Sequence, residues 1–543
     1  MRLKSKNALS GSGSEDESEA GSGAEGKEYS GKKPENTETV CVGKSSGSSE
    51  RKSQRLLESY AFLSNKMPIT VRIFTVSGEF VPLYEISISK ISENTEIILE
   101  KIREELITEV NLGLVDITST KKTGVIEQAF MDTIELLVRK HFPDIDDHTT
   151  NFLTAFLIQR SLGMGNVEIL MDDPRLEEVA INNSDEPVWV YHKNHGWLKT
   201  NVIVTTEDQI KHYATMIGRR IGRQISVLEP LLDAHLSEGD RANATLLPIS
   251  TKGNTITLRK FSRDPFTITH FIKYKTIHPA SAALIWLAMQ FELSAIIAGG
   301  TASGKTATLN VLASFIPPNQ RIVSIEDTRE LQLPKYLHWV PLSTRMPNAE
   351  KKGEISMADL LVNSLRMRPD RILVGEVRRQ KEAETLFEAI HTGHSCYTTF
   401  HANSAEETLR RFTHPPINVP ETLMPAISMI IMQFRNRRSG IRRTFQIAEI
   451  TEDSKVNLLK QYDTKKDVLV DVNKSRSLLN TIELYTGYSP KEINTLLREK
   501  EDVLKYLIRN NVDHVDTVGR AMAEYYTNKE QFMKLVRSNK RQG

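Results

Sequence analysis

The chain has 543 residues, in which 71 lysines and arginines nearly balance 69 aspartates and glutamates, so the formal net charge is only +2. This length exceeds what one hydrophobic core can organise and predicts about three or four domains. The near-neutral charge gives no electrostatic reason to expect a nucleic-acid partner. The two cysteines, Cys41 and Cys396, lie far apart in sequence, which argues against a disulfide framework and fits a reducing cytoplasm.

The N-terminal part of the chain changes character near residue 57. Residues 1–56 are rich in Ser, Gly, Glu and Lys and nearly free of large apolar side chains, so they predict a disordered tail. Between 57 and 149, β-branched runs at 69–74 and 80–88 predict strands, and amphipathic patterns at 97–110 and 125–142 predict helices. We therefore expect a small α/β or helical N-terminal module here.

The rest of the chain divides into four further parts. A helical pattern at 152–162 and strand-like runs at 176–182 and 188–191 predict an α/β domain over 150–262. Residues 263–276 have the composition of a linker, 277–450 carry the nucleotide-binding motifs described below, and 451–543 predict a mostly helical appendage.

The apolar stretch 282–298 is interrupted by Gln290 and Glu292, so it predicts a helix followed by a strand rather than a membrane span. No signal peptide opens the sequence. We therefore expect a soluble cytoplasmic protein that meets a membrane only peripherally, through partners.

The most specific motif is a phosphate-binding loop. It reads Gly299-Gly300-Thr301-Ala302-Ser303-Gly304-Lys305-Thr306 and matches G-x-x-x-x-G-K-[ST]. The glycines let backbone N–H groups turn towards phosphates, Lys305 reaches the β and γ oxygens, and the Thr306 hydroxyl ligates Mg²⁺. An apolar strand precedes the loop, and a helical pattern at 305–316 follows it, as nucleotide binding requires. The sequence thus predicts a binding site for a nucleoside triphosphate with Mg²⁺.

Carboxylates follow two downstream apolar strands. Glu326 and Asp327 end the run 321–327, and Glu376 ends the run 371–376. Because ligands bind at the carboxyl ends of strands in open α/β sheets, we expect these side chains to face the γ-phosphate. We interpret Glu376 as the residue that positions the attacking water and Glu326 as a residue that acts on Mg²⁺ or on water.

Histidines flank a third strand-like run, 395–400. His394 precedes it and His401 follows it, so either ring is a candidate sensor of the γ-phosphate. The spacing does not match a zinc site, because no ligand pattern or cysteine pair accompanies the histidines.

Taken together, the loop 299–306, the acidic segment 325–330, the segment 368–378 and the stretch 392–403 resemble, in order and spacing, the Walker A, Asp, Walker B and His boxes of the type II/type IV secretion ATPase superfamily. Residues 165–191, 326–330 and the C-terminal helices with Tyr525-Tyr526 look most like its archaeal-type branch, which includes archaellum motors and Tad-like pilus-assembly ATPases. The resemblance implies an α/β fold: a RecA-like P-loop NTPase C-terminal domain with a smaller α/β N-terminal domain.

The same resemblance implies an ATP-hydrolysing homohexamer that acts, through a polytopic membrane platform protein, on a type IV pilin-like filament or on secretion. It implies that Arg241 and Arg259 complete the ATP site from the N-terminal domain, which suits the fixed, permanently charged guanidinium fork. The chain lacks the tetracysteine metal module of many secretion ATPases, and Gly375 stands where other P-loop enzymes carry an aspartate.

Other functions remain open on the sequence alone. A nucleic-acid-translocating ATPase of a conjugation-type machine is the main alternative, and the near-neutral charge disfavours it. A P-loop kinase and a nucleotide sensor with little turnover are further ones. The residues do not distinguish an archaellum from an adhesive pilus or a secretion system, nor extension from retraction, and the preference for ATP over GTP rests on the family resemblance.

Overall fold

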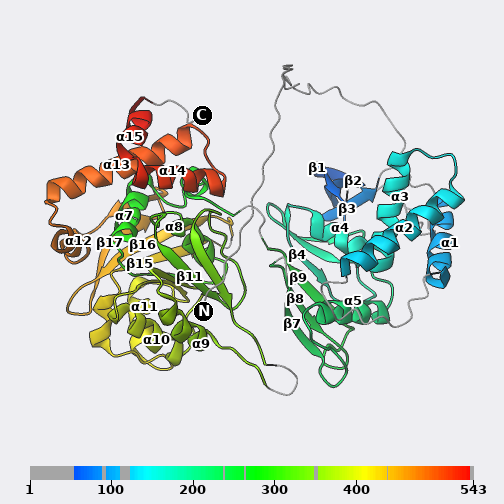
Figure 1. Cartoon of the computed structure of the whole chain (residues 1–543), viewed down its shortest axis with the longest axis horizontal. Helices are drawn as coiled ribbons and strands as arrows, with labels where there is room; N and C mark the ends of the chain where they lie inside the picture. Colours follow the sequence, from blue (N-terminus) through cyan, green and yellow to red (C-terminus); the bar gives the residue numbers. More distant parts are fainter. Residues whose placement is uncertain are drawn as a thin grey trace, which may run out of the picture. The chain divides into compact units, whose positions relative to one another are not determined.

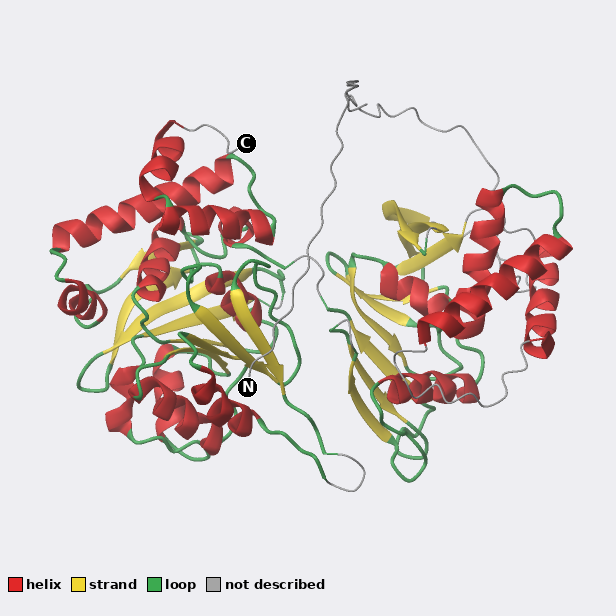
Figure 2. Ribbon diagram, in the orientation of Figure 1, coloured by secondary structure: helices red, strands yellow, loops and turns green. Residues whose placement is uncertain are grey.

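The computed structural model describes residues 54–65, 67–88, 93–109, 123–236, 239–261, 265–347, 352–436 and 438–538. Within these ranges the chain forms two nine-stranded sheets (Figures 1 and 2). We call residues 54–261 the N-terminal lobe and residues 265–538 the C-terminal lobe. Most of the segment expected to be a disordered tail, including Cys41, lies outside the described residues, but its last residues, Gln54 to Leu56, begin strand β1.

The N-terminal lobe is a sheet with helices on one face. Its strands are β1 (Gln54–Ser64), β2 (Met67–Val76), β3 (Leu83–Ile88), β4 (Leu176–Ile181), β5 (Trp189–His192), β6 (Gly196–Thr200), β7 (Leu231–His235), β8 (Arg241–Thr245) and β9 (Thr255–Arg259), and its helices are α1 (Glu93–Glu109), α2 (Thr123–His141), α3 (Asp147–Leu162), α4 (Asn166–Asp172) and α5 (Glu207–Arg220). All five helices contribute to one hydrophobic cluster against the sheet. Alternate residues of β2 are buried in it, as the period of two predicts.

One sheet crosses the boundary that the sequence analysis placed between residues 149 and 150. The strand order is β1-β2-β3-β6-β5-β4-β9-β8-β7, and β3 pairs with β6 in parallel, Leu83 opposite Lys199 and Tyr84 opposite Thr200. The segment 57–149 therefore supplies three strands and two helices to the same layer as residues 150–261. Its long-range pairing is invisible to a local sequence pattern.

The C-terminal lobe contains the second sheet. Its strands are β10 (Ala295–Gly299), β11 (Arg321–Glu326), β12 (His338–Ser343), β13 (Arg371–Val374), β14 (Ser395–Phe400), β15 (Met429–Arg435), β16 (Arg442–Ile450), β17 (Val456–Asp463) and β18 (Val468–Asp471). They lie in the order β12-β11-β13-β14-β10-β15-β16-β17-β18. The six strands from β12 to β15 are parallel, and β15 to β18 are antiparallel.

Helices cover both faces of this sheet (Figure 1). They are α6 (Ile268–Lys273), α7 (Pro279–Gln290), α8 (Lys305–Ala313), α9 (Met357–Ser364), α10 (Gln380–His391), α11 (Ala405–Thr413), α12 (Leu478–Thr486), α13 (Pro490–Arg509), α14 (Val515–Thr527) and α15 (Lys529–Ser538). Ile297 of β10 packs on the face with α7, α8 and α13 to α15, whereas its neighbours Ile296 and Ala298 pack on the face with α9 to α11. Burial on both faces explains the continuous apolar runs of these strands.

The C-terminal helices are part of this lobe's core. Trp286 of α7 stacks on Phe315 with ring centroids 5.3 Å apart, and its Nε1 donates to the Tyr526 hydroxyl of α14 at 2.7 Å. That hydroxyl in turn donates to the Phe315 carbonyl at 2.7 Å. Strands β17 and β18 also come from the segment expected to be an appendage, and the expected linker 263–276 contains α6. Residues 451–538 thus complete the core that supports the phosphate loop.

No helix among the described residues has the length and apolar character needed to cross a membrane. Cys396 is a buried free thiol.

Candidate nucleotide-binding site

The phosphate loop connects β10 to α8 with almost no spare room. A Cβ on Gly299 would lie 2.4 Å from the Ser303 Oγ and 2.5 Å from the Gln433 carbonyl oxygen, so no side chain fits there. Gly304 precedes α8 with φ 95°, and Ala302 at the loop tip has φ 58°, a left-handed conformation that is costly for a residue with a Cβ. The Arg442 Nε donates to the Ala302 carbonyl at 3.1 Å and holds the tip.

The loop carries polar groups prepared for an anion. Helix α8 has no side-chain cap at its amino end and no acidic residue in its first turn, so its positive end is open to an anion at the loop. The Ser303 Oγ is buried and has no hydrogen-bond partner in the described part of the chain. The Lys305 Nζ makes one long hydrogen bond, 3.3 Å to the Gly300 carbonyl. These donors fit a bound triphosphate.

Burial lowers the pKa of Lys305, and the neighbouring Arg378 lowers it further, while the carboxylate of Glu376 opposes the change. A partly desolvated ammonium between these charges gains most from an anionic ligand, because the attraction is strongest where water is excluded. The electrostatics therefore favour the phosphate-binding role predicted for Lys305. Lys305 and the adjacent Thr306 both line a cavity at the carboxyl edge of this sheet.

Glu326 ends β11 as a buried carboxylate. Its Oε1 accepts hydrogen bonds from the backbone N–H groups of Glu330 at 2.8 Å and Leu331 at 3.0 Å. Its Oε2 is buried and has no partner among the residues that the structure describes. Burial raises the pKa of Glu326 to about 7, against the two backbone hydrogen bonds that lower it. One oxygen thus anchors the loop after β11, and the other remains available in the cavity that Lys305 and Thr306 also line.

Glu376 follows β13 at the same edge of the sheet. The Gly375 N–H donates to the Ile325 carbonyl at 2.8 Å, and the Thr399 Oγ1 donates to the Gly375 carbonyl at 2.6 Å. These hydrogen bonds attach the turn to β11 and β14, so the sheet fixes the backbone position of Glu376. The sequence-based expectation that the end of the loop converges with Glu326 and Glu376 agrees with this geometry, since Lys305 and Thr306 line one cavity with both carboxylates.

Arg378 was not singled out from the sequence, yet it occupies the centre of this cluster. Its Nε and Nη2 donate to the Glu376 Oε2 at 2.9 and 2.6 Å, and its Nη1 lies 3.3 Å from the Asp327 Oδ2. Its side chain is 63% exposed, so these contacts are made at the surface of the lobe. An arginine two residues after a strand-end glutamate was the available sequence signal, but its partners depend on how the turn bends.

The two histidines separate. His401 follows the carboxyl end of β14, and its Nε2 lies 3.2 Å from the Thr301 Oγ1 of the phosphate loop. His394 precedes the amino end of β14, where its Nδ1 lies 3.2 Å from the Ala389 carbonyl oxygen. Because β14 runs parallel to β10, His394 lies at the opposite end of the strand from the loop, and the expectation that it senses the γ-phosphate there is wrong.

Arg241 and Arg259 lie on the first sheet, directly opposite each other in the antiparallel pair β8 and β9. Arg241 donates to both oxygens of Asp233, at 3.1 and 2.8 Å. Two exposed like charges directly opposite each other are unfavourable, and the Asp233 carboxylate offsets the charge of Arg241.

The fold and the site define a P-loop nucleotide-binding protein, with a RecA-like lobe and an N-terminal α/β lobe. A family model described as "Type II/IV secretion system protein" matches residues 238–453. The type IV secretion system protein PtlH of Bordetella pertussis is 31% identical over 49% of this chain and 88% of its own length. The chain belongs to the type II/type IV secretion ATPase superfamily.

Other relatives include the uncharacterized protein MJ0900 of Methanocaldococcus jannaschii, 33% identical over 72% of this chain and 73% of that protein. The putative conjugal transfer protein MT3759 of Mycobacterium tuberculosis is 32% identical over 53% of this chain and 85% of its own length.

Among solved structures, the pilus retraction motor PilT with bound ADP is 18% identical with a TM-score of 0.40, covering 68% of this chain and 96% of that one. The Legionella pneumophila ATPase DotB is 19% identical with a TM-score of 0.39, covering 69% of this chain and 96% of its own.

The raised pKa of Glu326 predicts a pH-dependent stability. Between the ordinary value of 4.5 and about 7 the unfolded chain releases this proton while the folded chain retains it, so the contribution of Glu326 to stability falls as pH rises through that window. The difference in the pKa of Glu326 between the folded and the unfolded chain corresponds to roughly 3 kcal/mol of lost stability at pH 8. Urea unfolding without magnesium should show Glu326→Gln gaining that much on the wild type between pH 4.5 and pH 8.

Glu330→Gln removes a nearby exposed carboxylate and serves as the control, with no such gain. A Glu326→Gln profile parallel to the wild type over this window would contradict the assignment of a buried, protonated Glu326.

Proposed function

We propose that the chain is a cytoplasmic ATPase that works as a homohexamer and drives assembly or rotation of a type IV pilin-like filament, or secretion, through a polytopic membrane platform protein. The observation that carries the proposal is that Lys305 and Thr306 of the phosphate loop line one cavity together with Glu326 and Glu376. The superfamily to which the chain belongs and the printed name of PtlH support the filament and secretion classes.

Each residue has a distinct task in this proposal. Lys305 and the N–H groups of loop 299–306 bind the phosphates of the substrate ATP. Thr306 and the unpartnered Oε2 of Glu326 supply oxygen ligands of the type that magnesium prefers, directly or through water. Magnesium, when bound, neutralises charge that develops on the phosphates. Glu376 orients the attacking water, and His401, in contact with Thr301, reports the state of the loop.

Arg241 and Arg259 would complete the site from an N-terminal lobe, either of the same subunit or of a neighbour in the ring. A guanidinium stabilises the charge of a phosphoryl transition state without needing a proton transfer. If ATP contacts Lys305 on one lobe and these arginines on another, binding and hydrolysis favour different lobe arrangements through differential contact energy. That difference is what a motor needs.

Arg378 would control when Glu376 acts. In the structure the Nε and Nη2 groups of Arg378 both donate to the Oε2 of Glu376. These hydrogen bonds compete with the use of the Glu376 carboxylate to orient water. The γ-phosphate of ATP offers Arg378 a stronger partner because it carries more negative charge. Transfer of Arg378 to the γ-phosphate would release Glu376 only when the triphosphate is present.

A second function, translocation of nucleic acid in a conjugation-type machine, is favoured by one observation, the printed name of the mycobacterial relative as a putative conjugal transfer protein. Stimulation of hydrolysis by single-stranded DNA that disappears as salt is raised would select this function. Hydrolysis that is indifferent to DNA supports the filament or secretion motor.

Replacement of Glu376 tests the assignment of the water-orienting group. Glu376→Gln should bind ATP within about threefold of the wild type and release phosphate at least about a hundredfold more slowly, because a neutral amide cannot polarise the water. Lys305→Ala should lose both ATP binding and phosphate release. Phosphate release and equilibrium binding of a fluorescent ATP analogue measure the two effects.

The exposed Glu384 of α10 provides the matched control, and Glu384→Gln should hydrolyse ATP normally. Wild-type turnover in Glu376→Gln would remove the carboxylate from the mechanism.

The proposed role of Arg378 predicts a selective loss. Arg378→Gln should weaken ATP binding by roughly tenfold to a hundredfold, the worth of a charge-assisted hydrogen bond, while ADP binding stays unchanged. Arg410→Gln, at an exposed position of α11, should change neither affinity. A parallel loss of ATP and ADP binding in Arg378→Gln would indicate a structural role instead.

A further inference from the structure

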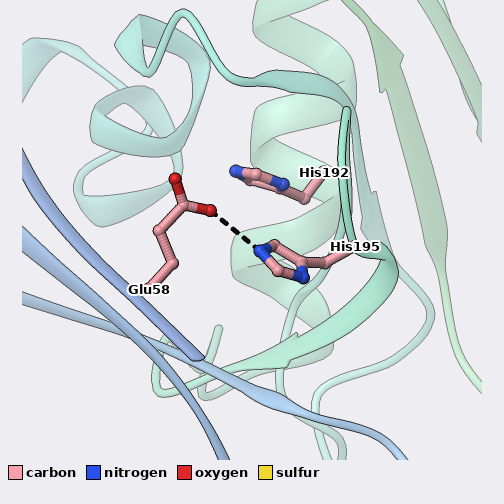
Figure 3. A group of neighbouring side chains, drawn as sticks. All are labelled: Glu58, His192 and His195. Atoms are coloured by element: carbon pink, nitrogen blue, oxygen red, sulfur yellow. Dashed lines mark hydrogen bonds and ion pairs between the residues drawn. The ribbon is translucent and has the colours of Figure 1, made fainter. Parts of the chain in front are cut away.

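A second cluster of chemically active side chains lies in the N-terminal lobe. Glu58 of β1, His192 at the end of β5 and His195 in the turn before β6 come together, although β1 and Glu58 are distant in the sheet order from β5 and β6 (Figure 3). One ligand atom from each residue lies within 4.8 Å of the other two. The ATP site uses none of them.

The contacts of Glu58 and His195 are satisfied within the cluster. The Glu58 Oε2 and the His195 Nε2 lie 2.8 Å apart, and the guanidinium of Arg175 binds the other carboxylate oxygen. Arg175 also lies over the Tyr60 ring, 3.9 Å from its centroid. The carboxylate is therefore held with Oε2 directed at His195, as Figure 3 shows.

The contact between Glu58 and His195 leaves the buried Nε2 of His192 without a partner among the described residues. The side chain of His192 is fully buried. Burial lowers the pKa of His192, and the neighbouring His195 lowers it further. An unpaired buried polar nitrogen is costly, and it calls for a ligand.

We propose that Glu58, His192 and His195 bind a divalent transition metal ion of the Zn²⁺ class. Two imidazoles and one carboxylate form a ligand set typical of zinc, whereas Ca²⁺ and Mg²⁺ prefer oxygen ligands alone. The ion joins β1 to the β5–β6 hairpin and fastens the first strands of the lobe to its centre. Solvent water completes the coordination on the partly exposed side of Glu58 and His195.

Two carboxylates and two cationic groups surround the cluster. The negative charges of Glu58 and Asp173 act on His192, while the guanidinium of Arg175 binds Glu58 and the ammonium of Lys260 donates to the Asp173 carbonyl. Asp173 is itself fixed by the hydroxyls of Tyr60 and Tyr84, each of which donates to its Oδ2 at 2.6 Å. The guanidinium of Arg175 binds the Glu58 oxygen that does not face His195 and thereby orients the carboxylate, as groups beside metal ligands commonly do.

Coordination requires specific proton movements. In the structure the Asn194 N–H donates to the His192 Nδ1 at 3.1 Å, which leaves the proton of the neutral ring on Nε2. Metal binding at Nε2 moves that proton to Nδ1, so the Asn194 N–H loses its acceptor and this hydrogen bond of the turn is broken. The proton between His195 and Glu58 likewise moves to the His195 Nδ1 or to solvent. Ligand atoms of a tetrahedral zinc site lie about 3.3 Å apart. The three side chains, whose ligand atoms lie within 4.8 Å of one another, therefore adjust to this spacing when the ion binds.

Metal uptake by the full chain without added histidine tags tests the proposal. After chelation and dialysis, the wild type should take up one equivalent of Zn²⁺ per chain, measured by elemental analysis, and Co²⁺ should give the visible absorption bands of a low-coordinate site. Glu58→Gln and His195→Gln should each weaken Co²⁺ binding at least about tenfold. His212→Gln, an exposed histidine of α5, should bind as the wild type does.

Both test positions are partly exposed, and circular dichroism verifies that each variant is folded. A wild type that takes up no more Zn²⁺ than folded His195→Gln would overturn the proposal, and so would uptake that survives in both ligand variants. ATP is omitted throughout, so the outcome is independent of the hydrolysis site.

Discussion

The register of the parallel strands β11, β13, β14 and β10 is the constraint on which the nucleotide site depends. Val374 lies opposite Ile325 and Thr398, and Ala298 lies opposite Phe400, so these strands end together. A shift of one residue would turn every buried side chain to the other face, where a different set of helices packs. The two cores therefore fix where the loops begin. The positions of the phosphate loop, Glu326 and Glu376 therefore depend on the register of these strands.

The groups at this edge are not arranged for stability. Ala302 is held with φ 58°, the Ser303 Oγ and the Glu326 Oε2 are buried without partners in the described ranges, and the first turn of α8 has no cap. Strain and unpaired polar atoms of this kind cost free energy in a protein without ligand. A bound magnesium nucleotide would satisfy several of them at once. The rest of the lobe, including the Trp286 and Tyr526 contacts of the C-terminal helices, supplies the packing that tolerates them.

Local pattern in the sequence was enough to find the phosphate loop, Glu326 and Glu376, because each is a short motif at the end of an apolar strand. The same reasoning was wrong for His394, since it treated both ends of a strand as equivalent, whereas only the carboxyl end of a parallel strand meets the loop. Arg378 escaped notice because its role depends on a turn that folds it back on Glu376. The cluster of Glu58 with His195 joins residues 137 apart in sequence, and no local pattern announces it. The pairing of β3 with β6 is equally non-local.

The central claim is that this edge of the sheet hydrolyses ATP within a ring of identical chains. The most direct test is the solution mass of the Glu376→Gln protein with and without Mg-ATP, because a trapped triphosphate stabilises whichever assembly binds it best. Addition of Mg-ATP should shift the protein to six subunits. A protein that remains a monomer while ATP is demonstrably bound would contradict a site shared between subunits.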